Sequence, residues 1–353
     1  MNDRNPDKKD CSDNEIPDYL AGDRFMATLL QAEALATAFE IGLVDCLISR
    51  GPAASDALAE RLTATPRGMV FLLDILTESG VVVRSEGKYM LSREFMAVLP
   101  YRELMELKLA LANLAARDIL GGFTDLVMRP EQFMRGSSFH RLFSYDRCFG
   151  NDESDRHVTS RWMRITTLLT RYESAACMAH HDFSRYRRIL DVGGNSGEFA
   201  LRLCRCYPDM RAVVFDLPLV CELGRAHVDG TPERDRISFM KGDVRTDELP
   251  TGHDLIIFKS MLHDWPDEAA LRFIHKAARS LLPGGRILIF EREKIAGVKQ
   301  PFPFSILPFL IFFHSYRPAE TYVGFLEQAG FVDIDIRSVN LDLPFVLITG
   351  QLP

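Results

Sequence analysis

Three short segments carry the residue types and spacing expected of a nucleoside-binding site. The first, DVGGNSG at 191–197, directly follows an apolar segment with the character of a strand. Glycines there let the backbone turn sharply and let a ligand approach closely, although a plain strand-to-helix turn has the same composition. The dinucleotide fingerprint G-x-G-x-x-G does not fit, because Asn195 stands two residues after Gly193. Asparagine adopts the left-handed backbone conformation at low cost, so Asn195 can replace a glycine.

Two acidic residues end the next two strand-like segments. Asp216 ends VVFD at 213–216, and Asp243 follows RISFMKG at 236–242. A carboxylate at the first position can accept hydrogen bonds from both hydroxyls of a ribose, and one at the second can accept from an adenine amino group. The carboxyl ends of adjacent parallel strands meet at one edge of an open sheet. The three segments therefore predict a nucleoside site without a pyrophosphate.

The elements that must position these residues begin near Tyr186. Strand-like and helix-like segments alternate from there onward, and the strands are almost continuously apolar. This pattern predicts an α/β fold with a parallel sheet covered by helices on both faces. The helix over 266–285 is expected to end at Gly284 and Gly285. The short connection at 341–344 requires the last two strands to be antiparallel.

The segment 19–99 predicts short helices followed by a hairpin, the arrangement of a winged helix. The first helix is expected to end at Gly42. Ser55 is expected to be the N-cap of the next helix and Pro66 to start another, before a hairpin that turns at 85–87. Winged helices either bind DNA or serve as dimerisation and packing modules. This segment has few basic side chains that could contact a phosphate backbone, which favours the dimerisation role. The basic side chains of the second short helix and the wing are mainly Arg61, Arg67, Arg84 and Lys88.

The segment 100–181 is predicted to be a helical linker and pocket wall. Irregular stretches are expected at 129–138 and 146–155, followed by one long helix over 157–183. Burial statistics for such residue types favour a core position for most of the apolar residues on this helix. Four of its residues either line a pocket or belong to the core: Trp162, Met163, Thr166 and Leu169.

Composition narrows the class of protein. The 353 residues have a net charge of -7, so the chain lacks the basic surplus of strong nucleic-acid binders. A mean hydropathy of -0.04 and the lack of a long apolar run argue against a membrane-spanning helix. The polar N-terminus has no signal-peptide core, and the scattered cysteines predict reduced thiols. We therefore expect a cytoplasmic protein with no nucleic-acid or membrane partner.

The α/β part resembles the Rossmann-like domain of the S-adenosylmethionine-dependent methyltransferases. More narrowly, it is similar to the small-molecule O-methyltransferases, which include plant caffeate-type enzymes, hydroxyindole O-methyltransferase and bacterial antibiotic-tailoring enzymes. The block HDWPDE at 263–268 is the most specific element of the resemblance. The other motifs agree in order and spacing: LDVGGNSGEFALRL at 190–203, VVFDLP at 213–218, GDV at 242–244 and LLPGGRILIFE at 281–291.

The resemblance covers nearly the whole chain and implies its organisation. It implies a class I methyltransferase domain at 182–353, with an antiparallel terminal strand, that binds S-adenosylmethionine and releases S-adenosylhomocysteine. The helical linker at 100–181, a winged-helix dimerisation domain at 19–99 and a disordered leader at 1–18 precede it. It further implies a homodimer that methylates an aromatic or polyketide-like small molecule in secondary metabolism, such as antibiotic biosynthesis.

The resemblance and the residue patterns together predict three sets of site residues. His263 is the general base, Glu291 orients it, and Asp264 stands beside it. The substrate set is Trp162, Met163, Thr166, Phe309, Phe313 and His314. The cofactor-binding set is Asp191, Gly193, Gly194, Gly197, Asp216, Leu217, Asp243, Val244 and Lys259.

The implied chemistry needs these residue types. A sulfonium methyl group is already activated, so transfer needs an in-line nucleophile and removal of one proton. A phenol has a pKa of about 10 and free histidine one of about 6.5, so deprotonation by His263 is uphill by roughly 3.5 pH units. An acidic neighbour such as Glu291 or Asp264 raises the pKa of the histidine, and the nearby sulfonium favours a phenolate. The sequence offers no metal-binding set, and metal-independent catalysis is expected.

The chain departs from the family at two places. Members commonly carry Arg-Thr-Glu at the start of the last helix, and that glutamate is a second partner of the histidine. Here the matching residue is Ala319, and Glu320 lies about 100° further around the helix. Either Glu320 substitutes imperfectly, or His263 works with Glu291 alone. A bulky aromatic stretch at 307–317 predicts a tight apolar pocket for a planar aromatic substrate, although some of its side chains are expected in packing or at a dimer surface.

Three alternative functions stay open. The acceptor atom can be a carbon or nitrogen of an aromatic molecule, in which case histidine support matters less. A repurposed enzyme can keep the cofactor as a structural cation, although an intact His263 and Glu291 argue against this. A winged-helix regulator with a ligand-sensing domain would bind DNA tightly at physiological salt, which the acidic charge of the chain disfavours.

Overall fold

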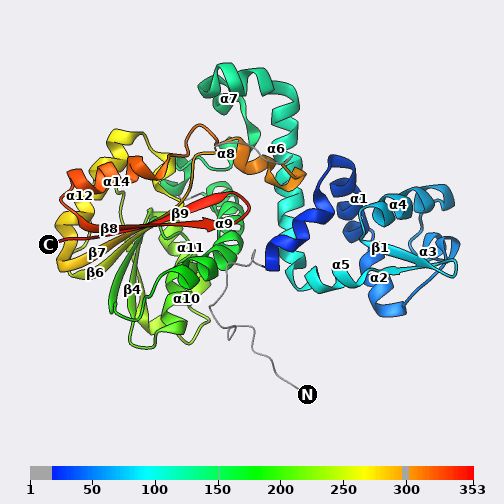
Figure 1. The fold of residues 1–353 in the computed structure, drawn as a ribbon, viewed down its shortest axis with the longest axis horizontal. Coiled ribbons are helices and arrows are strands. Elements are labelled where there is room, and N and C mark those ends of the chain that lie inside the picture. Colours follow the sequence, from blue (N-terminus) through cyan, green and yellow to red (C-terminus); the bar gives the residue numbers. More distant parts are fainter. Residues whose placement is uncertain (1–17, 151, 296–301) are drawn as a thin grey trace. The chain divides into compact units, whose positions relative to one another are not determined.

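The computed structural model describes residues 18–150, 152–295 and 302–353, and these fold as two compact units (Figure 1). The helical unit comprises Asp18–Ser144 and Ile295–His314. The sheet unit comprises Tyr145–Lys294 and Ser315–Pro353. Of the leader predicted at 1–18, all but Asp18 lies outside the described residues.

The sheet unit is built on a mostly parallel sheet. Among the described residues this sheet has seven strands in the order β5-β4-β3-β6-β7-β9-β8. The strands from β3 to β7 pair in parallel, whereas β9 is antiparallel to both β7 and β8. This confirms the predicted α/β fold and its antiparallel terminal pair. The strands are β3 (Arg188–Val192), β4 (Arg211–Asp216), β5 (Ile237–Lys241), β6 (His253–Lys259), β7 (Leu281–Arg292), β8 (Val332–Asn340) and β9 (Pro344–Gln351).

Helices cover both faces of this sheet, as the apolar strands predicted (Figure 1). Leu190 and Val192 pack in one buried cluster with α12 and α14, whereas Ile189 packs in another with α9, α10 and α11. The split follows from strand geometry, since successive side chains point to opposite faces. The helices are α9 (Glu153–His180), α10 (Glu198–Cys206), α11 (Pro218–Val228), α12 (Asp267–Ser280) and α14 (Ala319–Gln328), with the short turns η3 (Asp146–Phe149), η4 (Arg234–Arg236) and η5 (Leu262–Asp264) between elements.

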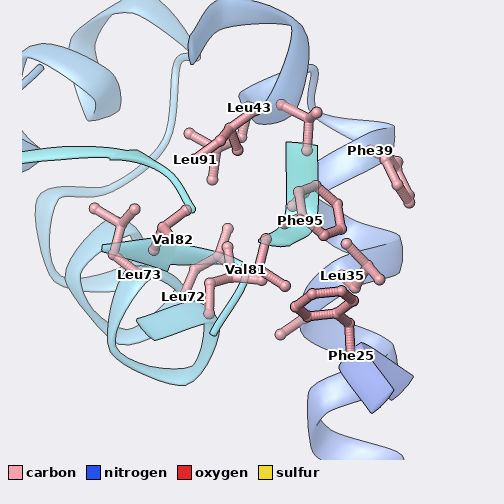
Figure 2. Packing of buried hydrophobic residues seen from close by; sticks show 14 of the residues in the cluster. Phe25, Leu35, Phe39, Leu43, Leu72, Leu73, Val81, Val82, Leu91 and Phe95 are labelled. Atoms are coloured by element: carbon pink, nitrogen blue, oxygen red, sulfur yellow. The ribbon is translucent and has the colours of Figure 1, made fainter. Parts of the chain in front are cut away.

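The helical unit has its own apolar core, shown in Figure 2. Phe25 meets Phe95 edge to face with ring centroids 5.1 Å apart, and Leu35, Leu73 and Val81 are fully buried around them. The elements are η1 (Asp18–Met26), α1 (Leu29–Glu40), α2 (Leu43–Arg50), α3 (Ser55–Arg61), α4 (Pro66–Glu78), β1 (Val82–Ser85), β2 (Lys88–Leu91), α5 (Arg93–Val98), η2 (Leu99–Tyr101), α6 (Arg102–Met128), α7 (Pro130–Gly136), α8 (Ser138–Arg141), η6 (Phe304–Ile306) and α13 (Leu307–Leu310).

Several predicted element boundaries are confirmed. Gly42 follows the end of α1 with a φ of 74°, and Pro66 is the first residue of α4. The strands β1 and β2 form the predicted hairpin. Residues 100–181 divide between the units, since α6, α7 and α8 belong to the helical unit and α9 to the sheet unit.

Three local predictions are wrong. Ser55 is not a cap but the first residue of α3, because a backbone bridge between Ala53 and Tyr89 holds the preceding chain extended. The stretch 129–138 is helical rather than irregular, because Pro130 starts α7 at the position where its missing N–H costs nothing. The helix expected to reach Gly284 ends at Ser280, because Leu281 already pairs with β6.

In the described parts of the chain, no helix combines the length and the apolar character needed to cross a membrane.

Candidate active site

The glycine-rich loop between β3 and α10 needs unusual backbone conformations. Gly193, Asn195 and Gly197 have φ values of 70°, 55° and 75°. The left-handed position predicted for Asn195 is therefore confirmed. A side chain is also excluded at Gly194, where a Cβ would lie 2.6 Å from the Asp191 carboxylate. The loop thus presents bare backbone beside the ends of β3 and β4.

Asp216, at the end of β4, is tied to this loop. Its Oδ2 accepts from the backbone N–H of Asn195 at 2.8 Å, and its Oδ1 accepts from that of Leu217 at 2.8 Å. Burial raises the pKa of Asp216 to about 6, although the hydrogen bonds from these two amides lower it. Each carboxylate oxygen has a further lone pair, so Asp216 retains the capacity to accept from two hydroxyls of a ribose.

Asp191, the last residue but one of β3, is only 2% exposed. Within the described residues its Oδ2 has no hydrogen-bond partner. Burial raises the pKa of Asp191 to about 7, although the charge of Lys259 opposes this. A buried acceptor without a partner is costly, so the site suits a cationic donor. The ammonium group of S-adenosylmethionine fits this requirement, and the glycine loop and Asp216 fit the rest of that molecule.

Two other predicted cofactor residues are engaged in ion pairs. The Asp243 carboxylate binds Arg245, with Oδ2 2.8 Å from the guanidinium, and Arg245 in turn lies over the Trp265 ring at 5.5 Å. Lys259 binds Glu173 on α9. Val244 offers its carbonyl to Lys276 Nζ at 2.8 Å. The structure therefore gives Asp243 and Lys259 charge partners within the protein itself.

His263 lies in η5, directly after β6, and contacts two carboxylates. Its Nδ1 is 2.7 Å from Glu291 Oε2, and its Nε2 is 3.4 Å from Asp264 Oδ1. Glu291 is fully buried in β7, and its Oε1 accepts from the backbone N–H groups of Met261 and Leu262, both at 2.7 Å. Glu291 therefore fixes both the histidine loop and the imidazole orientation, with the Nδ1 proton directed to Glu291.

The two carboxylates change the basicity of His263. Burial lowers the pKa of the imidazole, but the charges of Asp264 and Glu291 more than offset it, so the pKa is raised above 6.5. Arg292 acts in the opposite direction. The site can therefore hold a proton on Nε2 more firmly than free histidine does.

Arg317 is a residue of this site that no predicted set contained. Its guanidinium donates to the carbonyl of Leu262 at 2.9 Å, to the carbonyl of Trp265, and to Asp267 Oδ1 at 2.7 Å. It therefore clamps the loop that carries His263. The sequence did offer a signal for it, because Arg317 matches the arginine of the family's Arg-Thr-Glu when Ala319 matches the glutamate.

Glu320 does not take the place of the family glutamate. Its side chain is exposed, and its charge acts on Glu293, whose pKa burial and Glu320 both raise. Ala319 occupies the buried start of α14. The second carboxylate at His263 is therefore Asp264.

The predicted substrate residues lie in both units. On α9, Thr166 donates its hydroxyl to the carbonyls of Trp162 and Met163 at 3.2 and 3.1 Å. Trp162 and Met163 are buried, and the Trp162 indole N–H has no partner within the described residues. The helical unit carries the rest of the set: Phe309, which is buried, and Phe313 and His314, which are exposed.

This fold, with its glycine-rich loop and buried acidic residues, suits an S-adenosylmethionine-dependent methyltransferase. Residues 127–332 match the model of the O-methyltransferase domain, and residues 24–94 match that of the O-methyltransferase dimerisation domain. The chain belongs to this O-methyltransferase family. The helical unit accordingly contains the family's dimerisation domain.

Individual relatives agree with this assignment. Acetylserotonin O-methyltransferase of Rattus norvegicus is 27% identical over 314 residues, covering 87% of this chain and 71% of the relative. The 3-hydroxy-5-methyl-1-naphthoate 3-O-methyltransferase of Streptomyces sahachiroi is 28% identical, covering 74% of each chain. The solved structure of human N-acetylserotonin methyltransferase in complex with SAM has a TM-score of 0.70 at 23% identity, covering 95% of this chain and 96% of that one.

Proposed function

We propose that this enzyme methylates a hydroxyl group of an aromatic small molecule, with His263 as the general base. The observation that carries the proposal is the 2.7 Å contact between His263 Nδ1 and the buried Glu291, which directs Nε2 away as the proton acceptor. The two curated relatives are named for acetylserotonin and for a hydroxynaphthoate, both of which are aromatic hydroxyl compounds.

The cofactor residues are proposed on the fit of their side chains. Asp191 Oδ2 would accept from the ammonium group, and Asp216 would accept from the ribose hydroxyls. The rest of the proposed set forms the surrounding wall: Gly193, Gly194, Gly197, Leu217, Asp243, Val244 and Lys259. When bound, S-adenosylmethionine supplies an electrophilic methyl group on a sulfonium sulfur.

The proposed proton transfer follows from the charges around His263. With S-adenosylmethionine bound, the substrate oxygen would take the methyl group as the methyl–sulfur bond breaks and S-adenosylhomocysteine leaves, and the hydroxyl proton would pass to Nε2 of His263. The product of that step is an imidazolium, which Asp264 and Glu291 stabilise. A phenol is less acidic than an imidazolium by roughly 3.5 pH units. Stabilising the imidazolium raises its pKa and so reduces this difference.

We also propose a homodimer formed through the dimerisation domain at 24–94. Large apolar side chains are exposed on this part of the helical unit, which favours burial against a partner. They include Leu29, Leu30 and Phe71.

Adding one methyl group to the cofactor loop tests the proposed cradle. Gly194→Ala is expected to weaken S-adenosylmethionine binding about tenfold or more, because its Cβ would lie 2.6 Å from the Asp191 carboxylate and 3.0 Å from Val214. Calorimetric titration with the cofactor measures the change. Gly230→Ala is the control, since nothing lies within 4 Å of a Cβ there. Equal affinity in both variants would contradict the proposed cradle.

The substrate proposal is tested by transfer of a labelled methyl group. The protein is incubated with S-adenosylmethionine labelled on its methyl group and a panel of phenols, catechols, hydroxyindoles and polyketide aromatics. Label on an oxygen supports the proposal. Label on carbon or nitrogen would replace it with the corresponding C- or N-methyltransferase.

A further inference from the structure

Tyr145 contacts Asp264, the residue next to His263, although no motif contains it. Its hydroxyl donates a hydrogen bond to Asp264 Oδ2. Its ring stacks on Trp265 at a centroid distance of 5.8 Å and an angle of 15°, and it contacts Trp162 edge to face at 5.8 Å. Two indole rings therefore hold the phenol ring, and the hydroxyl is aimed at the carboxylate.

Asp264 uses its two oxygens differently. Oδ2 accepts from Tyr145, whereas Oδ1 lies 3.4 Å from His263 Nε2. At that distance Asp264 attracts the imidazole as an ion once Nε2 is protonated, and no short hydrogen bond joins the two groups. Asp264 can therefore stabilise a proton that has arrived on Nε2 while leaving the neutral nitrogen accessible to one.

We propose that Tyr145 is a positioning residue for proton transfer: its hydroxyl holds the Asp264 carboxylate at His263, so that Asp264 serves as the second carboxylate of the base. The inference rests on the proposed role of His263. Its structural reason is the alanine at position 319, which leaves the imidazole without a carboxylate from the start of α14. A carboxylate on an exposed turn needs a tether to fill that place, and Tyr145 supplies one.

Several other groups face this cluster. Glu291 and Arg292 approach from β7, Tyr316 from the segment before α14, and Tyr322 from α14. Burial and Arg292 lower the pKa of His263, whereas Asp264 and Glu291 raise it. Burial and Asp264 raise the pKa of Tyr145, so its hydroxyl stays protonated and donating. Tyr145→Phe therefore removes a hydrogen bond and no charge.

The test is a titration of His263 in the full-length protein without substrate. Histidine labelled on the imidazole carbon gives one NMR signal per ring, and the signal missing from His263→Asn identifies His263. We expect Tyr145→Phe to lower the pKa of His263 by about half a pH unit or more, because Asp264 is no longer held at Nε2. Asp264→Asn should lower it further, and adding Tyr145→Phe to Asp264→Asn should change nothing more.

Tyr186→Phe is the matched control. It removes a phenol hydroxyl that lies 3.0 Å from His181 Nε2, and it should leave the His263 signal unchanged. An unchanged His263 pKa in Tyr145→Phe would overturn the inference. The inference is also overturned if Asp264→Asn leaves the pKa of His263 unchanged. That result can be obtained even if Tyr145→Phe does not fold.

Activity separates this inference from the proposed function. With an acceptor found in the labelled-methyl panel, Tyr145→Phe should move the acid limb of the kcat/KM profile to lower pH, since the base loses its proton at lower pH. Its plateau should fall about three- to tenfold, because a weaker base drives the transfer less. If His263→Asn is fully active, the proposed function fails. If His263→Asn is inactive but Tyr145→Phe has the wild-type pH profile, only the positioning role fails.

Discussion

His263→Asn is expected to lower kcat by about 10²–10⁴-fold while leaving the dissociation constant for S-adenosylmethionine nearly unchanged. The asparagine amide can still donate a hydrogen bond to Glu291, but it does not take up a proton at neutral pH. The cofactor cradle around Asp191 and Asp216 does not contact the imidazole in any described interaction, so cofactor binding should persist. Turnover of the acceptor found in the panel and calorimetric titration with the cofactor measure the two quantities separately.

Two further variants make this result specific. His157→Asn replaces an exposed histidine of α9 and should retain full activity. Glu291→Gln should lose activity as well, since its buried carboxylate holds both the imidazole and the amides of Met261 and Leu262. Full activity in His263→Asn would show that the acceptor loses its proton without a protein base, as a carbon or nitrogen acceptor can.

The sheet and the backbone of the glycine-rich loop were predictable because they depend on local patterns. The place of Asp216 at a strand end follows from the apolar segment before it, and the turn at Asn195 follows from a backbone preference that asparagine shares with glycine. Burial of both sheet faces follows from the apolar strands alone. Each of these inferences needs only residues within a few positions of one another.

The contacts around His263 were harder to predict because they join distant segments. Tyr145 reaches Asp264 across 119 positions, and Arg317 reaches Leu262 across 55. No local pattern marks Tyr145, and the signal for Arg317 was its place in the segment that matches the family's Arg-Thr-Glu. Lys259, which the resemblance places near the cofactor's ring, has a similarly distant partner, since its amine binds Glu173 on α9, 86 positions away.

Glu173 joins α9 to the sheet through two buried ion pairs. Its carboxylate binds Lys259 at the end of β6 and Arg292 at the end of β7, with Arg292 Nη2 at 2.6 Å. The three side chains are between 5% and 8% exposed. Burial opposes ionisation of Glu173, but the two cations hold its pKa down to about 2. Removing this carboxylate would leave two cations buried without their anion.

Glu173→Gln is therefore expected to lower the free energy of unfolding of the sheet unit by about 3–5 kcal/mol. Urea denaturation followed by tryptophan fluorescence measures this unit alone, because both tryptophans, Trp162 and Trp265, belong to it. The folded-state pKa lies below the unfolded value of about 4.3, so the stabilisation is complete above that value. The difference between wild type and variant should narrow as the pH falls from about 4 towards 2.

An exposed ion pair on the same unit provides the comparison. Glu222 binds Arg156 at 2.9 Å with its side chain 50% exposed, and Glu222→Gln should cost less than about 0.5 kcal/mol. Adding Lys259→Met to Glu173→Gln should restore part of the loss, because only Arg292 is then left without its anion. A loss below about 1 kcal/mol in Glu173→Gln would mean that water reaches the two cations once the carboxylate is gone. The junction between α9 and the sheet would then be held by apolar packing rather than by charge.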